Sequence, residues 1–116
     1  MPLKTPFSGG NWIAAPLNVD ITASGFGLFA PAYRKDHLGI VYLRGTASSS
    51  SGSVSTILSL PSGFRPTASC RFIIFAVDSG SAISTGFLEM RSNGNLAYLG
   101  GGSSAFSLDQ IFFATY

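Results

Sequence analysis

Clusters of Gly, Ser and Pro divide this chain into short apolar segments with a period of two. No window places apolar residues at i, i+3, i+4 and i+7 over three turns, as an amphipathic helix requires. β-Branched and aromatic residues dominate the segments, as a pleated and half-buried surface favours. We expect strands at residues 38–46, 54–60, 70–77, 86–91, 95–99 and 110–116.

The segment before Leu38 has a less regular pattern, because Pro16, Pro31 and several glycines interrupt it. Two short strands are expected there, around residues 12–14 and 17–21, after a flexible lead-in at residues 1–10. Seven or eight short strands without a helix in 116 residues predict a single all-β domain. The expected architecture is a compact antiparallel β-sandwich or barrel-like head.

Three connections can be predicted from their composition. The Ser/Gly tracts at residues 46–53 and 100–104 are too low in complexity to pack a core, so we expect mobile connections, the first a hairpin tip. The dipeptide Asn93-Gly94 tolerates positive φ and suits a two-residue type I′ turn. Residues 86–91 and 95–99 are therefore expected to pair as an antiparallel hairpin.

The segment VSTILSL at residues 54–60 alternates between two faces. One face carries Val54, Thr56, Leu58 and Leu60, and the other carries Ser55, Ile57 and Ser59. The pattern predicts one face in the core and one wetter face.

The segment CRFIIFAV at residues 70–77 is apolar on both faces. Phe72 and Ile74 point to one side, and Ile73, Phe75 and Val77 point to the other. This pattern predicts a central strand with apolar cover above and below the sheet.

The composition is unusually apolar, with 10% charged and 46% hydrophobic residues and a mean hydropathy of +0.36. Some of the apolar surface is expected to need a partner. The longest apolar run, FIIFAV, is far shorter than the roughly 20 residues that span a bilayer, and MPLKTPFSGG lacks a signal-peptide core. The seven basic residues are scattered along the chain, so we expect neither membrane insertion nor nucleic-acid binding.

Residues that could carry catalysis are scarce. The chain has five Asp and Glu in total and one histidine, and it contains no Gly-x-Ser-x-Gly nucleophile elbow and no phosphate-binding glycine motif. Cys70 and His37, the only cysteine and histidine, cannot supply the four ligands of a structural zinc site. We therefore expect no catalytic residue, no metal and no cofactor. Cys70 is predicted to be buried and inert, and Glu89 to be a solvated partner of Arg91 or of a neighbouring strand.

The order of several motifs resembles the C-terminal receptor-binding head of bacteriophage tail fibres. That family shows a Lys-Asp dipeptide before a Gly-x-Val-x-Leu-x-Gly strand, then a Leu-Pro-x-Gly-aromatic-Arg-Pro turn, then a Ser-Leu-Asp-x-Ile strand. The matching positions are Lys35, Asp36, Gly39, Val41, Leu43, Gly45, Leu60, Pro61, Gly63, Phe64, Arg65, Pro66, Ser107, Leu108, Asp109 and Ile111. The likeness runs from about Trp12 to the end, and its specific parts begin at Tyr33.

The resemblance implies a homotrimer at the tip of a virion appendage that binds bacterial surface saccharide without cleaving it. Other tail or virion proteins are the expected further partners. Fibres of that family usually carry a long N-terminal shaft, whereas this chain has no coiled-coil heptads or collagen-like repeat. Both a head piece and a small separate virion protein therefore stay open, and the alternative function is a structural virion component, such as a capsid decoration or fibre-tip cap.

Saccharides are usually held by an aromatic face together with planar polar side chains. The residues with this chemistry are Trp12, Asp78, Arg91, Asn93, Asn95 and Tyr98, and we predict that they form the binding site.

Two further interactions are expected to be structural. In LPSGFRP, Pro61 ends a strand and takes the second position of a turn, and Gly63 takes a positive φ. Phe64 is expected to pack beneath the turn, and Arg65 to cap carbonyls or pair with an acid. Arg44 lies on the same strand face as Ile40 and Tyr42, and an ion pair to Asp109 or Asp36 is expected to offset its burial.

Overall fold

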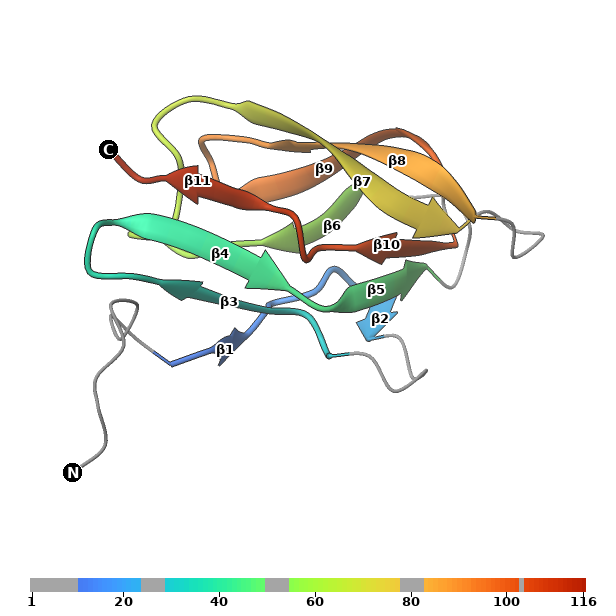
Figure 1. Ribbon diagram of the computed structural model, residues 1–116, viewed down its shortest axis with the longest axis horizontal. Coiled ribbons are helices and arrows are strands. Elements are labelled where there is room, and N and C mark those ends of the chain that lie inside the picture. The colour runs from blue at the N-terminus through green and yellow to red at the C-terminus, as the bar shows by residue number, and fades with distance from the viewer. Residues whose placement is uncertain (1–10, 24–28, 50–54, 78–82, 103) are drawn as a thin grey trace.

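The computed structural model describes residues 11–23, 29–49, 55–77, 83–102 and 104–116 (Figure 1). These ranges contain eleven strands and no helix, so the all-β prediction is confirmed. Accordingly, no helix in the described ranges is able to span a bilayer. The expected lead-in at residues 1–10 and the expected tip at residues 50–53 lie outside the described residues.

A four-stranded antiparallel sheet lies on one side of the molecule, in the order β11-β4-β3-β1. Its strands are β1 (Ile13–Ala14), β3 (Ala32–Lys35), β4 (Ile40–Arg44) and β11 (Phe112–Ala114). Val41 and Leu43 point inward and are buried, whereas the alternate residues of β4 are only half-buried on the outer face. The sheet therefore has one core face and one face that meets solvent.

A seven-stranded antiparallel sheet curls around the rest of the core in the order β2-β5-β10-β7-β8-β9-β6. Its strands are β2 (Ile21–Ala23), β5 (Thr46–Ser49), β6 (Thr56–Ser59), β7 (Cys70–Val77), β8 (Ile83–Met90), β9 (Asn95–Gly101) and β10 (Ala105–Ser107). Leu17, just before β2, makes a bridge to Leu58 of β6, and Asn18 N–H donates to the carbonyl of Ile57. These contacts nearly close the sheet into a barrel.

The two sheets share one two-stranded ribbon. β4 continues into β5 through Gly45, and β10 continues toward β11 through the segment that contains Asp109 (Figure 1). At this crossing Gly45 N–H donates to Asp109 Oδ1 at 2.8 Å, and Leu108 N–H donates to the carbonyl of Gly45 at 2.8 Å. Gly45 has φ +100°, and a Cβ there would lie 2.5 Å from the carbonyl oxygen of Ala30. Only glycine fits this corner without a backbone shift.

The core lies between the two sheets and takes side chains from both. Its largest fully buried members are Phe106, Ile57, Leu58, Leu60, Leu88, Met90, Leu96, Leu108, Ile111 and Val41. The strict alternation predicted for residues 54–60 is wrong, because Ile57 and Leu58 are both fully buried. The register against β9 shifts between Thr56 and Leu58, and this irregularity turns two successive side chains inward.

Several strand boundaries differ from the prediction. Residues 46–49, expected in a mobile tip, form β5, and Gly100 and Gly101, expected in a loop, extend β9. The strand expected at residues 38–46 is divided by Gly45, and the one expected at 17–21 is a single bridge at Leu17 followed by β2. Strands β3 and β10 were not expected. β10 has only three residues and is stabilised by pairing on both sides, with β5 and β7.

The hairpin of β8 and β9 is confirmed, but its turn is not the two-residue type expected. Gly94 N–H donates to the carbonyl of Arg91, and Arg91 N–H donates to the carbonyl of Asn95. Ser92, Asn93 and Gly94 therefore form a three-residue loop that ends on a glycine with φ +92°. This is the arrangement of a turn followed by a bulge at a left-handed glycine.

The segment LPSGFRP forms a corner between β6 and β7. Phe64 N–H donates to the carbonyl of Pro61, so Pro61 occupies the first position of the turn rather than the second. Gly63 has φ +93°, as expected, and the ring of Phe64 packs edge-on against Tyr33 with centroids 4.9 Å apart. Arg65 Nε donates to the carbonyl of Leu60 at 3.0 Å, so the expected capping of a carbonyl is confirmed.

Candidate functional site

The described residues that were predicted to bind saccharide lie in two groups, one on each sheet. Arg91, Asn93, Asn95 and Tyr98 belong to the hairpin of β8 and β9 in the seven-stranded sheet. The cation–π contacts of Trp12 are with two arginines of the four-stranded sheet, and Asp78 lies outside the described residues. The role of these six residues in saccharide binding stays a prediction.

Most of the hairpin residues already have internal partners. Asn93 Oδ1 accepts from Asn95 N–H at 3.0 Å, and Asn95 Oδ1 accepts from Ser59 Oγ at 2.7 Å. Tyr98 donates its hydroxyl to the carbonyl of Gly101 at 2.6 Å. These side chains stabilise the turn and the strand ends of the hairpin, which accounts for their positions without a ligand.

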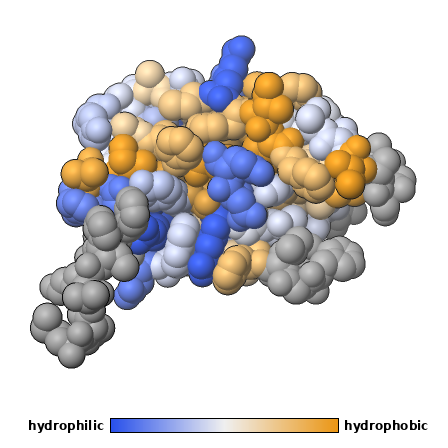
Figure 2. All heavy atoms as spheres, viewed as in Figure 1, coloured by the Kyte–Doolittle hydropathy of each residue, from blue (hydrophilic) through white to orange (hydrophobic). Residues whose placement is uncertain are grey.

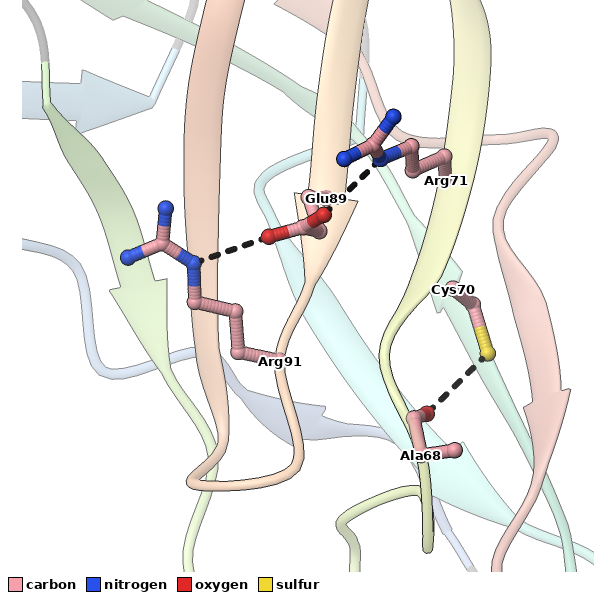
Figure 3. A network of polar contacts seen from close by, with 5 residues as sticks. All are labelled: Ala68, Cys70, Arg71, Glu89 and Arg91. Carbon is pink, nitrogen blue, oxygen red and sulfur yellow. Dashed lines mark hydrogen bonds and ion pairs between the residues drawn. The ribbon is translucent and has the colours of Figure 1, made fainter.

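Arg91 belongs to an ion-pair network on the outer face of the seven-stranded sheet. Glu89 lies between two arginines, with Arg71 Nε 2.9 Å from Oε2 and Arg91 Nε 3.0 Å from Oε1 (Figure 3). Glu89 is opposite Arg71 in the pairing of β7 with β8. The hydrogen bonds from Arg71 and Arg91 lower the pKa of Glu89 below its ordinary value. The predicted pairing of Glu89 with Arg91 or a neighbouring strand is confirmed, since it makes both contacts.

Cys70 lies beside this network but takes no part in it. Its Sγ donates to the carbonyl of Ala68 at 3.5 Å, and its side chain is half-buried against the core rather than fully buried as expected (Figure 3).

A row of alternating aromatic rings and guanidinium groups crosses the outer face of the four-stranded sheet. Phe112 of β11 is opposite Tyr42 of β4, and Arg34 of β3 is opposite Tyr42 on the other side. The rings of Phe112 and Tyr42 stack with centroids 6.3 Å apart. The guanidinium carbon of Arg34 lies 5.5 Å from the Tyr42 ring centroid and 5.4 Å from that of Trp12.

Arg44 continues this row and lies between two rings. Its guanidinium carbon lies 4.4 Å from the Trp12 ring centroid and 4.2 Å from that of Phe29. The ion pair expected between Arg44 and Asp109 or Asp36 is wrong, because both carboxylates bind backbone N–H groups instead. Contacts between a cation and ring faces, each worth about 0.5–2 kcal/mol, replace it. We call Trp12, Phe29, Arg34, Tyr42, Arg44 and Phe112 the arginine–aromatic row.

Asp36 is buried at the turn between β3 and β4 and holds the Tyr42 hydroxyl of the row. Its Oδ1 accepts from Leu38 N–H and Ile40 N–H, both at 2.9 Å, and its Oδ2 accepts from the Tyr42 hydroxyl at 3.0 Å. Burial raises the pKa of Asp36, but the three hydrogen bonds outweigh burial and hold the pKa below its ordinary value. The same carboxylate, together with burial, raises the pKa of Tyr42. Asp36 therefore serves as an ionised structural anchor.

The outer face of the seven-stranded sheet is strongly apolar. Ile73, 70% exposed, is opposite Phe87, 42% exposed, and Phe75 and Ile83 follow on the same two strands. Hydrophobic residues gather in the upper right of the space-filling view, where β7 and β8 lie in Figure 1 (Figure 2). The prediction that β7 is covered on both faces is therefore wrong for the single chain. We call Ile73, Phe75, Ile83 and Phe87 the apolar outer face.

Groups suited to metal binding or acid–base catalysis are not clustered in the part of the chain that the structure describes. No three of its His, Cys, Asp and Glu side chains come together in a way that could hold a metal ion. The described carboxylates with shifted pKa values, Asp36 and Glu89, lie on different sheets. Comparisons of the chain with protein-family models, curated proteins and solved structures give no match.

Proposed function

We propose that this chain is a receptor-binding head of a bacteriophage tail fibre, which assembles as a homotrimer on the virion and binds bacterial surface saccharide without cleaving it. The observation that carries the proposal is that the first of the three resembling motifs contacts each of the other two. Lys35 Nζ of the first motif donates to the carbonyl of Gly63 in the second at 2.7 Å. Gly45 N–H of the first motif donates to Asp109 of the third, 64 residues away. Matches that arose by chance in separate segments have no reason to meet in this way.

The apolar outer face supports the homotrimer. Exposed apolar residues that adjoin one another usually mark an interface. Three linked copies also suit saccharide recognition, because the binding of one sugar site is weak and linked sites raise avidity. A second copy of the chain is the expected occupant, since the neighbouring Arg71, Glu89 and Arg91 are mutually paired and leave the apolar residues to make the contact. Light scattering at micromolar concentration is expected to give a trimer.

Binding to cells tests the recognition step. Fluorescently labelled protein is expected to bind intact host bacteria and to be displaced by polysaccharide purified from their surface. The polysaccharide is expected to show no new reducing ends after incubation. Absence of binding to host cells and to a host glycan array would refute the proposal, and release of reducing ends would refute its non-enzymatic part.

A structural virion component is the second candidate, and the same apolar outer face favours it, because capsid or fibre-tip assembly uses such surfaces equally well. Binding to purified capsids without binding to cells is the result that this function predicts.

A further inference from the structure

The arginine–aromatic row has the chemistry of a binding site that the sequence prediction did not identify. It combines two cationic guanidinium groups with four aromatic rings on one face of a small sheet. Phe29 is 64% exposed and Phe112 is 61% exposed, so rings at both ends of the row present area to solvent. Rings of this kind cover the apolar C–H face of a sugar.

Arg44 has unused hydrogen-bonding capacity. Its Nε atom is buried and has no hydrogen-bond partner among the described residues. No described carboxylate lies within 4.0 Å of its guanidinium group, whereas Arg71 and Arg91 share Glu89 and Arg65 binds the carbonyl of Leu60. Stacking on Trp12 and Phe29 fixes the plane of the Arg44 guanidinium group without using its N–H donors.

The two acidic side chains that were expected to pair with Arg44 make other contacts. Asp109 accepts from Gly45 N–H, and Asp36 accepts from two backbone N–H groups and the Tyr42 hydroxyl. Neither carboxylate forms an ion pair with Arg44. A fixed, planar and charged donor with this environment is suited to bind a carboxylate or a phosphate in a bidentate manner.

We propose that the arginine–aromatic row binds an acidic saccharide, with Arg44 holding the anionic group and the exposed rings covering the sugar. The inference rests on the proposed function and specifies its ligand class. A uronic-acid carboxylate and a sugar or glycerol phosphate each present a pair of anionic oxygens to the guanidinium group, so both belong to this class.

The fluorescence of Trp12 reports on this site directly, because Trp12 is the single tryptophan of the chain and contacts Arg44. The protein is titrated with oligogalacturonate as the carboxylate probe and with poly(glycerol phosphate) as the phosphate probe. Fully methyl-esterified oligogalacturonate is the neutral control. We expect a saturable change in Trp12 emission with at least one acidic probe, little change with the neutral control, and weaker binding as salt is added.

Two variants show whether Arg44 carries the binding. Arg44→Gln removes the charge and is expected to weaken the binding of the acidic probe on the order of 10- to 100-fold. Arg71→Gln is the matched control on the other sheet and is expected to bind like the parent. Two further variants replace Arg44→Gln if that variant does not fold. Arg44→Lys keeps the charge without the planar guanidinium group, and Phe112→Ala removes an exposed ring.

The inference is overturned if calorimetry and Trp12 fluorescence detect neither acidic probe, if the neutral control binds equally well, or if the Arg44 variants bind like the parent. Binding to host cells tests the proposed function separately. If Arg44→Gln binds host bacteria as tightly as the parent, saccharide recognition stands and lies at another surface. If the parent binds no host cell, the proposed function itself fails.

Discussion

Asp109 accepts a hydrogen bond from the backbone N–H of Gly45, 64 residues earlier in the chain, at the point where the shared ribbon passes from one sheet to the other. The Oδ1 atom and the nitrogen are 2.8 Å apart. Ser107 Oγ lies 3.4 Å from the other carboxylate oxygen, which is a weaker contact. The carboxylate thus replaces the strand-to-strand hydrogen bond that the corner at Gly45 interrupts.

Removing this carboxylate is expected to destabilise the whole domain. Asp109→Ala leaves Gly45 N–H without its acceptor, and we expect a loss of about 1–2 kcal/mol in the free energy of unfolding. Asp109→Asn keeps an oxygen that can accept and is expected to lose less. Urea denaturation measures both, and Ser107→Ala serves as a control with little effect. Equal stability of Asp109→Ala and the parent would contradict the role of the carboxylate.

A pair of glycine variants separates backbone strain from steric clash. Gly45 and Gly63 both have positive φ, but a Cβ at Gly45 meets the Ala30 backbone, whereas a Cβ at Gly63 meets nothing within 4 Å. Gly63→Ala is expected to cost about 1–2 kcal/mol from its φ alone. Gly45→Ala is expected to cost at least about 3 kcal/mol, because the crossing must also shift. Thermal melts of the two variants test this order, and the reverse order would refute the geometry of the crossing.

Stability is expected to fall in acid because of Asp36. Its pKa in the folded protein is below the ordinary value of 3.8, so its contribution is fully present above about pH 4 and is lost as pH falls through the depressed folded pKa. The lowered pKa of Glu89 acts in the same direction. Melting temperatures between about pH 6 and pH 2 are expected to fall less steeply for Asp36→Asn than for the parent. Glu89→Gln measures the contribution of Glu89 to this pH dependence separately. Equal slopes of melting temperature against pH for Asp36→Asn and the parent would contradict the prediction.

The corner at LPSGFRP is expected to matter for folding rather than for ligand binding. Arg65→Ala removes the donor to the carbonyl of Leu60 and is expected to lower the free energy of unfolding by about 1 kcal/mol. Binding to host cells, measured at a temperature where the variant is folded, is expected to change little. Unchanged melting combined with lost cell binding would reassign Arg65 to recognition.

The apolar outer face is expected to hold the trimer together. Ile73→Lys places a charge opposite Phe87, and desolvating that charge in an interface is costly, so we expect monomers by light scattering. Ser62→Lys, on the exposed corner before β7, is the matched control and is expected to remain trimeric. A trimer that tolerates Ile73→Lys would place the subunit contact on another surface.

Local patterns in the sequence predicted the strands that carry strong alternation or a clear turn. Cys70–Val77 was located to the residue, and the hairpin at Gly94 was found, because short-range backbone preferences decide both. β10 escaped prediction because three residues carry too little pattern, and its stability comes from two neighbouring strands that are distant in sequence. Burial on β7 was overestimated, because periodicity shows which residues are apolar but not whether another layer covers them.

The candidate site was less predictable than the fold. Trp12, Phe29 and Arg44 are separated by 15 or more residues, and their contact depends on how β1, β3 and β4 pair. From the sequence, the charge of Arg44 suggested an acidic partner. In the structure, the carboxylates of Asp109 and Asp36 accept hydrogen bonds from backbone N–H groups instead. Single-residue chemistry selected Trp12 as an aromatic candidate but did not predict its contacts with Arg34 and Arg44.

The position of β10 has a consequence for synthesis on the ribosome. β10 lies between β5 and β7, so these two strands are joined within the sheet only after residues 105–107 have emerged. The nascent chain must hold the apolar segment of β7 without its final neighbour while translation continues. We expect folding to be limited by this long-range closure, so that the time spent in an aggregation-prone state depends on when β10 is made.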